Sequence, residues 1–392
     1  MIRTFFIILC SLLLLTGCWN NQEIDNVALV HGVGLDKSDG QLNISVEIIK
    51  PTSQQEGGQG ASQGGGQHIV LEKNAGTLLE GARGLIRYAK RRLEFGHTRV
   101  WLIGERLAKE DFVHVLDSVR RDQMLRLNSY LFITNENPSD ILNTPTLYEN
   151  LTATELVSAL EQTQFAAEYS PIKLREFYKL IEGTIPNAYI PMISIKKEAE
   201  QTITSIDGTA VIKNNQMVGQ LNVKETVGLN WLLNHAEGGS IAVSLDENEK
   251  VSFEITKAKT ETKPHLNGKK LNVDIQTKIE GTLADNMTAK KVNEHFFKDI
   301  EKKISRHVEN EMRSTLKKLQ EELKTDITEI GLETYRTDPK QFQNIRSEWS
   351  DIFANAEISI NVDANFTHEG LVKESVHRED RKPYNNPYPF SK

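Results

Sequence analysis

Both cysteines of this 392-residue chain, Cys10 and Cys18, lie within its first 18 residues. The rest of the chain therefore cannot form an intrachain disulfide or a cysteine-containing zinc site, and its fold must be held by packing alone. A chain of this length can form two or three domains, each with its own core. The formal charge of −7 excludes a general nucleic-acid binder, which needs an excess of Lys and Arg.

The segment around Cys18 has the organisation of an export signal. Arg3 supplies a short positive region, and an apolar run from Phe5 to Leu15 follows it. This run is too short to cross a bilayer, which takes about 20 residues, and it fits the apolar region of a signal peptide. Gly17 and Cys18 come next, and the arrangement resembles the lipobox of bacterial lipoproteins. The sequence thus predicts a lipoprotein signal peptide over residues 1–17 and a mature chain tethered by a lipidated Cys18.

Strand and helix patterns alternate through the first half of the chain. Two β-rich runs, 26–36 and 41–51, are joined by a turn and predict a hairpin. Glycine, glutamine and serine dominate residues 52–67, which predicts a flexible loop. Further strands are expected at 68–72, 97–105 and 127–136, and helices at 75–95, 110–125, 153–167 and 172–182. The alternation predicts an N-terminal α/β region over residues 18–199, with room for two subdomains.

The second half of the chain is richer in hairpins and contains the longest regular pattern. We expect two strands within 203–221, a helix at 222–236, three strands within 238–283 and a last strand at 356–370. Between about 288 and 324, apolar residues recur every three or four positions: Val292, Phe296, Ile300, Ile304, Val308, Met312, Leu316, Leu319 and Leu323. Because this spacing drifts off a heptad seam, it favours a long helix laid across the strands over a coiled coil.

The fold class predicted from these patterns is α+β, with mixed and antiparallel sheets packed against helices in two to three domains. A C-terminal α+β domain that holds the long amphipathic helix is expected over residues 200–375. Residues 376–392 are rich in proline and asparagine, and we expect them to form a disordered tail.

No motif in the sequence predicts catalysis. The segment Gly60-Ala61-Ser62-Gln63-Gly64 matches G-x-S-x-G, but it lies in the glycine-rich loop and not on a strand-to-helix turn. The segment Gly32-Val33-Gly34 lacks the third glycine of a dinucleotide site, and the histidines do not pair at metal-ligand spacing. We therefore expect no catalytic residue, no metal site and no cofactor.

A basic segment stands out in this acidic chain. Between Ala75 and Arg126 the basic residues are Arg83, Arg87, Lys90, Arg91, Arg92, Arg99, Arg106, Lys109, Arg120, Arg121 and Arg126, against seven acidic residues. On a membrane-tethered protein, such a patch can face anionic headgroups or an acidic partner. The alternative is a solvated helix face with local ion pairs.

Several stretches resemble the Ger(x)C family, the lipoprotein subunits of spore germinant receptors. Cys18-Trp19, followed by Glu23-Ile24 and ALVHGVGLDK, is similar to the start of the family's mature chain. The family's Gly-His-x-(Lys/Arg) strand and Arg-Asp-x-x-x-Arg stretch are matched by Gly96, His97, Arg99, Arg121, Asp122 and Arg126. These six residues are expected to form either a contact surface for partners or a buried structural network. Trp349 and Phe353, before the last strand, also resemble the family, and we expect them in the core.

The resemblance implies a non-enzymatic receptor subunit, anchored by Cys18 to the outer face of the inner spore membrane. It would assemble with two polytopic membrane subunits into a complex that senses nutrients and triggers germination. Two alternatives remain open. A solute-binding lipoprotein of an importer would show two similar lobes around a cleft. A cell-envelope hydrolase would need acidic, His or Ser side chains gathered in a cleft, for instance around His97 and Glu105.

Overall fold

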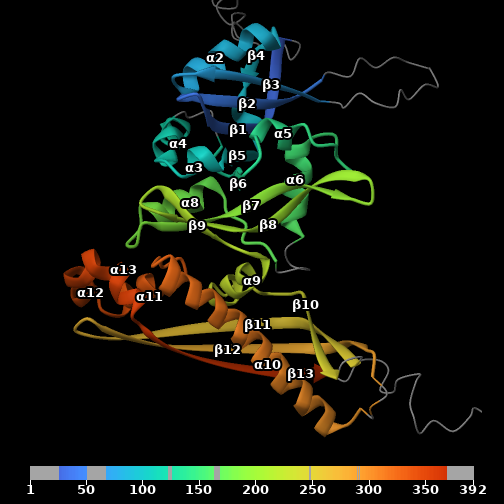
Figure 1. The fold of residues 1–392 in the computed structure, drawn as a ribbon, viewed down its shortest axis with the longest axis vertical. Helices are drawn as coiled ribbons and strands as arrows, with labels where there is room; N and C mark the ends of the chain where they lie inside the picture. Colours follow the sequence, from blue (N-terminus) through green and yellow to red (C-terminus); the bar gives the residue numbers. More distant parts are fainter. Residues whose placement is uncertain are drawn as a thin grey trace, which may run out of the picture.

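The computed structural model describes residues 26–50, 68–121, 126–162, 168–246, 249–288, 290 and 292–368. The predicted signal peptide with Cys18, the glycine-rich loop with Ser62, and the expected C-terminal tail lie outside these residues. Within them, two β-sheets with their covering helices follow one another along the long axis of the molecule (Figure 1). This arrangement confirms the predicted α+β class, with mixed sheets packed against helices.

The first sheet is mixed and, over the described residues, has nine strands. Their bounds are β1 Val27–Ser38, β2 Gln41–Ile49, β3 His68–Ala75, β4 Arg92–Glu94, β5 Val100–Gly104, β6 Tyr130–Thr134, β7 Asn187–Glu198, β8 Gln201–Lys213 and β9 Gln216–Leu221. The order is β3-β2-β1-β5-β6-β7-β8-β9, and β4 pairs with the start of β1. Strands β1, β5, β6 and β7 run parallel, whereas the strands on either side of them pair antiparallel.

Helices cover both faces of this sheet. They are α2 Leu78–Ala89, α3 Glu105–Ala108, α4 Phe112–Arg121, α5 Pro138–Leu142, α6 Thr152–Glu161 and α8 Leu174–Ile181. Successive residues of β5 show why both faces are apolar: Trp101 belongs to the cluster that contains Phe112, while Leu102 belongs to the cluster that contains Leu156. Because neighbouring side chains of a strand point to opposite faces, a central strand covered on both sides becomes a continuous apolar run.

A buried carboxylate joins β2 to the start of α6. The side chain of Glu47 is fully buried, and its two oxygens accept the backbone N–H groups of Thr152 at 2.7 Å and Ala153 at 3.0 Å. The Nε2 atom of His68 lies 3.9 Å from the same carboxylate. Burial raises the pKa of Glu47 to about 7, although the two backbone N–H groups favour its charged form.

This raised pKa predicts a stability that falls as the pH rises. The pKa of Glu47 in the folded chain lies above its unfolded value near 4.3, so between these values only the folded chain keeps the proton. The contribution of protonated Glu47 to the free energy of unfolding is complete at low pH and is lost as the pH rises through 7. From pH 5 to pH 8, the free energy of unfolding of the wild type should fall by about 2–3 kcal/mol relative to a Glu47→Gln variant.

Urea denaturation of the two proteins across this pH range measures the difference. Glu72→Gln is the matched control, because Glu72 is an exposed residue of β3. Parallel pH profiles for the wild type and the Glu47→Gln variant would contradict the prediction.

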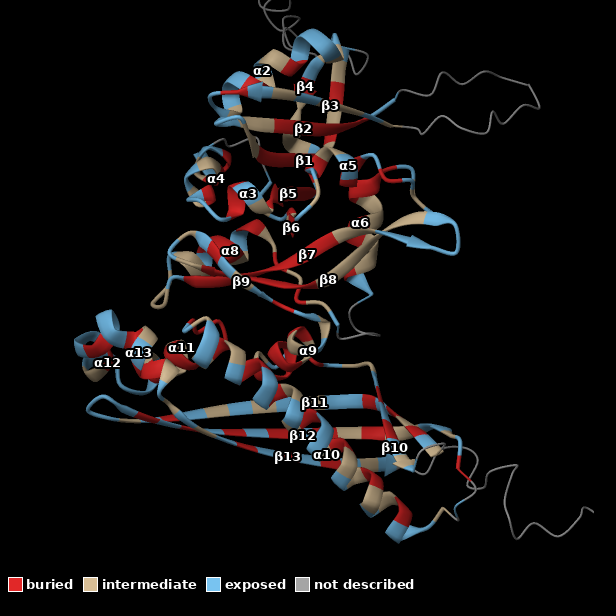
Figure 2. Ribbon diagram, in the orientation of Figure 1, coloured by how far each residue is buried: buried red, intermediate tan, exposed pale blue. Residues whose placement is uncertain are grey.

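The second sheet is formed, in the described residues, by β10 Ser240–Asp246, β11 Glu249–Asn267, β12 Lys270–Asn286 and β13 Glu357–His368, in that order. Strands β12 and β13 are parallel, and the other pairs are antiparallel. Along β11 and β12 many buried and exposed residues alternate, whereas β1, β2 and β7 are buried along longer runs (Figure 2). The second sheet thus buries one face, as antiparallel sheets with one solvated side do.

The long helix predicted from the apolar spacing covers this buried face. Helix α10 spans Glu294–Lys317 and continues as the π-helical turn η3, Lys318–Glu322. Asn293 caps its start by accepting the N–H of Phe296 at 2.9 Å. Seven of the nine apolar positions of the predicted stripe are buried, among them Ile300, Val308 and Met312, and the two end positions, Val292 and Leu323, are half-buried. The helix contacts β10 and β13, so the prediction of a helix laid across the strands is confirmed.

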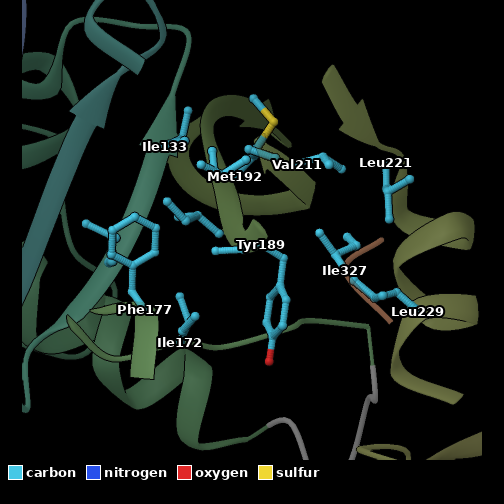
Figure 3. Packing of buried hydrophobic residues seen from close by; sticks show 14 of the residues in the cluster. Ile133, Ile172, Phe177, Tyr189, Met192, Val211, Leu221, Leu229 and Ile327 are labelled. Atoms are coloured by element: carbon cyan, nitrogen blue, oxygen red, sulfur yellow. The ribbon is translucent and has the colours of Figure 1, made fainter. Parts of the chain in front are cut away.

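The two sheets are joined by packing as well as by the chain. Helix α9, Val223–Leu232, leads from the first sheet to the second, and helices α11 Ile330–Thr337, α12 Pro339–Ile345 and α13 Trp349–Ala354 lead into β13. Figure 3 shows Leu229 of α9 and Ile327 at the edge of the cluster that contains Tyr189. One apolar cluster therefore extends from Ala28 to Ala364, through both sheets.

The structure corrects three local predictions. The helix expected at 75–95 spans only Leu78–Ala89, because Lys90 adopts the left-handed conformation with φ 56°. Residues 92–94 instead form β4, whose partner at the start of β1 is distant in sequence and leaves no local pattern. The proline-containing stretch at 183–197, which had no predicted strand, contains most of β7.

The predicted boundary between residues 199 and 200 falls in the turn that joins β7 to β8. These strands pair along their whole length, and the first sheet continues to Leu221.

Candidate functional site

Three of the residues singled out from the sequence lie where β5 meets β1. Gly96 and His97 belong to the short 3₁₀ turn η2, Phe95–His97. The N–H of Arg99 donates to the His31 carbonyl at 2.8 Å, and the Arg99 carbonyl accepts the Tyr130 N–H at 2.8 Å. The His97 and His31 rings are 6.3 Å apart between centroids. Burial lowers the pKa of His31, and the charges of His97 and Arg99 lower it further.

The other three predicted residues are placed differently. The Arg121 side chain is 79% exposed and pairs with Asp117, one helical turn earlier in α4. Asp122 lies outside the described residues. The Arg126 carbonyl accepts the hydroxyl of Ser129 at 2.9 Å. In the part of the chain that the structure describes, no hydrogen bond or ion pair joins Arg121 or Arg126 directly to Gly96, His97 or Arg99.

Ser129 connects the two stretches and was not singled out from the sequence. Its hydroxyl lies 2.7 Å from the Thr98 carbonyl as well as 2.9 Å from the Arg126 carbonyl. Its side chain is buried, and its carbonyl accepts the N–H of Leu174 at 3.0 Å. A buried serine before a strand carries no local signal of such a role, because its partners come from separate parts of the chain.

Trp349 and Phe353 lie in the core, as expected. Both side chains are buried, and the Trp349 ring lies 5.1 Å from the ring of Phe342 between centroids. The indole N–H of Trp349 donates to the Asp326 carboxylate at 3.1 Å. These aromatic residues thus fix the corner between α10 and the helices that follow it.

The basic segment divides into two parts. From Arg106 onward four residues form ion pairs. Lys109 with Glu105 and Arg121 with Asp117 are one helical turn apart, whereas Arg106 with Asp36 and Arg120 with Glu182 join distant parts of the chain. Five residues on and just after α2 have no ion pair with any described residue: Arg83, Arg87, Lys90, Arg91 and Arg92. Arg99 and Arg126 likewise form no ion pair with a described residue. Ion pairs therefore account for four of the eleven basic residues, all of them from Arg106 onward.

A pocket of about 630 Å³ lies at the junction of the two sheets. Its lining comes from the region of α8 and β7, from the loop after α9, and from the corner before α11. The titratable groups in the lining are Tyr169, Glu176, Lys179, Tyr189, His235, Glu237, Asp326, Glu329 and Arg336. The volume is in the range of small-molecule sites.

Tyr189 gives this pocket a polar group on an apolar wall. Its side chain is 7% exposed, and its hydroxyl points away from the apolar cluster (Figure 3). The hydroxyl makes no hydrogen bond with a described residue. Burial raises the pKa of Tyr189, and the nearby charges of Glu329 and Glu176 raise it further. The hydroxyl is therefore protonated at neutral pH and can donate a hydrogen bond into the pocket.

The described residues contain no group of three or more His, Cys, Asp and Glu side chains arranged to hold a metal ion. None of the helices formed by these residues is both long and apolar enough to span a membrane.

Comparison with known proteins places this fold in a family. The family described as "Spore germination protein N-terminal domain" matches residues 20–195, and the family "Spore germination B3/ GerAC like, C-terminal" matches residues 207–370. Spore germination protein B3 of Bacillus subtilis is 24% identical over 94% of this chain and 98% of its own length. Spore germination protein A3 of the same organism is 26% identical over 92% of this chain and 96% of its own length.

A solved structure shares the fold. The crystal structure of the GerBC protein superposes with a TM-score of 0.55 and 20% sequence identity, over 86% of this chain and 97% of that chain. Both family models match in order along the sequence, and together they cover most of it. This chain therefore belongs to the Ger(x)C family of spore germination proteins.

Proposed function

We propose that this chain is a lipid-anchored, non-enzymatic subunit of a nutrient germinant receptor. Cys18 would tether it to the outer face of the inner spore membrane, where it would assemble with two polytopic membrane subunits. The observation that carries the proposal is the match to both germination-family models, in order and over most of the chain. The lipobox-like Gly17-Cys18 after a short apolar run supports the anchor.

The residue contacts favour this proposal over a hydrolase. A hydrolase centred on His97 and Glu105 would need these two side chains in one cleft. The His97 ring instead faces His31, and Glu105 pairs with Lys109 at 2.8 Å in the first turn of α3. The importer alternative calls for two similar lobes, whereas the two sheets differ in strand number, order and direction.

Replacement of Cys18 by Ala tests the anchor. Two or more acyl chains hold a protein durably on a bilayer, whereas a chain without them keeps only weak surface contacts. We expect the wild type to partition almost entirely into the detergent phase and the Cys18→Ala variant to leave it. Spores that carry the variant should lose the nutrient response, and polytopic proteins should no longer co-purify with it.

The chain offers its own control for this experiment. Cys10 lies in the predicted signal peptide, so Cys10→Ala should leave partitioning, co-purification and germination unchanged. Normal germination of the Cys18→Ala strain, or co-purification of the wild type with importer components, would contradict the proposal.

A further inference from the structure

Helix α2 exposes a stripe that its partner strands do not cover. The stripe consists of Leu79, Arg83, Ile86 and Arg87, which share one face of the helix, together with Lys90, which follows the last helical residue. Leu79 is 58% exposed and Ile86 is 39% exposed. On the opposite face of the helix, Leu85 is fully buried. We call these five residues the α2 stripe.

The α2 stripe is positively charged. Arg91 and Arg92 extend it, which gives five basic residues between 77 and 92 against one acidic residue, Glu80. The Glu80 carboxylate accepts the Gly76 N–H at 3.0 Å and is engaged at the start of the helix. None of the five basic side chains has an ion pair within the described residues. The surface is therefore strongly positive on a chain whose net charge is −7.

The α2 stripe lies next to the place where the chain leads to Cys18. Strand β4 pairs with the first residues of β1, with Arg92 opposite Val27 and Leu93 opposite Ala28. Paired strands lie about 5 Å apart. Seven residues separate Cys18 from Asn26, and the eight Cα-to-Cα steps between them span about 29 Å at most. Helix α2 and β4 are at the end of the molecule opposite the four-stranded sheet (Figure 1).

We propose that the α2 stripe, with Arg91 and Arg92, rests on the anionic headgroups of the bilayer that carries Cys18. The inference rests on the lipid anchor of the proposed function and adds the surface that faces the membrane. The guanidinium and ammonium groups would bind lipid phosphates, while Leu79 and Ile86 enter the boundary between headgroups and acyl chains. An acidic protein would satisfy the charges, but the aliphatic side chains between them and the adjacent tether favour lipid. The second sheet then stands at the end of the molecule away from the bilayer.

The cysteine content of the mature chain allows a direct measurement. Once the signal peptide is removed and Cys18 is lipidated, no other cysteine remains. A fluorophore attached to Ile86→Cys reports on the α2 stripe, and one attached to Met287→Cys is the control, since Met287 is 65% exposed after β12 in the other sheet. The lipidated chain is bound to phosphatidylcholine vesicles with or without phosphatidylglycerol, and quenching by lipids with brominated acyl chains is measured.

The label at position 86 should be quenched several-fold more than the label at 287, and only in vesicles that contain phosphatidylglycerol. Each Lys or Arg near an anionic surface favours the surface-bound state over the unbound state roughly fivefold. Adding Arg83→Gln, Arg87→Gln and Lys90→Gln should therefore lower the equilibrium constant for contact between the α2 stripe and the bilayer by a factor on the order of 100. Quenching at 86 then falls to the control level, while the vesicles still carry the protein in flotation.

The two parts of the experiment separate the two proposals. If the wild type does not float with vesicles, the lipid anchor fails and the inference fails with it. If it floats and both labels are quenched equally, the anchor stands and the membrane-facing stripe is wrong. If the label at 86 is shielded only when acidic membrane proteins co-purify, the stripe binds protein and the lipid assignment is wrong.

Discussion

Replacement of Asp326 by Asn is expected to lower the free energy of unfolding by about 2–4 kcal/mol. The Asp326 side chain is buried at the corner after α10, where four donors converge on its two oxygens. Oδ1 accepts the N–H and hydroxyl of Thr328 at 2.9 and 2.8 Å, and Oδ2 accepts the N–H of Gly331 at 2.7 Å and the indole N–H of Trp349 at 3.1 Å. Burial raises the pKa of this carboxyl, although the four hydrogen bonds favour the charged form and act in the opposite direction.

An asparagine side chain cannot satisfy these donors. Three of them are N–H groups, which only donate, whereas asparagine offers one oxygen and places two further N–H groups in the same site. At least one buried donor then loses its acceptor. The Asp326 carbonyl also accepts the Asn187 side chain of β7 at 3.0 Å, so a shift of this corner affects the contact between the two sheets.

Urea denaturation followed by tryptophan fluorescence and circular dichroism measures the loss. Asp363→Asn is the matched control, since Asp363 is exposed in β13, and we expect it to change the stability by less than about 0.5 kcal/mol. Equal midpoints for the two variants would show that the four hydrogen bonds do not hold this corner.

Periodicity predicted the long helix and most strands because these features are local. The apolar positions of α10 recur within one helix, so the stripe alone predicts a buried face, and the structure shows that this face packs against β10 and β13. The pairing of β4 with β1 and the parallel contact of β6 with β7 join residues that are distant in sequence. Single-sequence patterns carry no information on such partners, which is why β4 and β7 were missed.

The same distinction applies to the candidate sites. The basic segment was visible in composition, but only the structure separates residues that form ion pairs, such as Arg120 with Glu182, from the unpaired residues of α2. Leu79 and Ile86 lie on the outer side of the short helix, because Gly81 and Leu85 already fill the contact with the sheet. The pocket at Tyr189 combines three separate segments, so no motif could predict it.

Replacement of Gly228 by Ala is expected to destabilise the protein by about 2–3 kcal/mol. A Cβ atom at this position in α9 would lie 2.4 Å from the Glu311 carbonyl oxygen and 2.2 Å from the Thr315 hydroxyl oxygen of α10. That hydroxyl cannot easily move, because it lies 2.8 Å from the Glu225 carbonyl and 3.0 Å from the Glu311 carbonyl. The two helices must therefore move apart, and this movement weakens the contact between the two sheets.

Gly84→Ala gives a control in which the same substitution should have the opposite sign. Gly84 is also helical, but its new Cβ would meet only the flexible end of the Lys73 side chain. In a helix, alanine is favoured over glycine by about 1 kcal/mol. We therefore expect Gly84→Ala to stabilise the protein by up to about 1 kcal/mol, measured by thermal and urea unfolding. A stabilising effect of Gly228→Ala would mean that α9 and α10 are not in close contact, and that the two sheets are not held together through this helix pair.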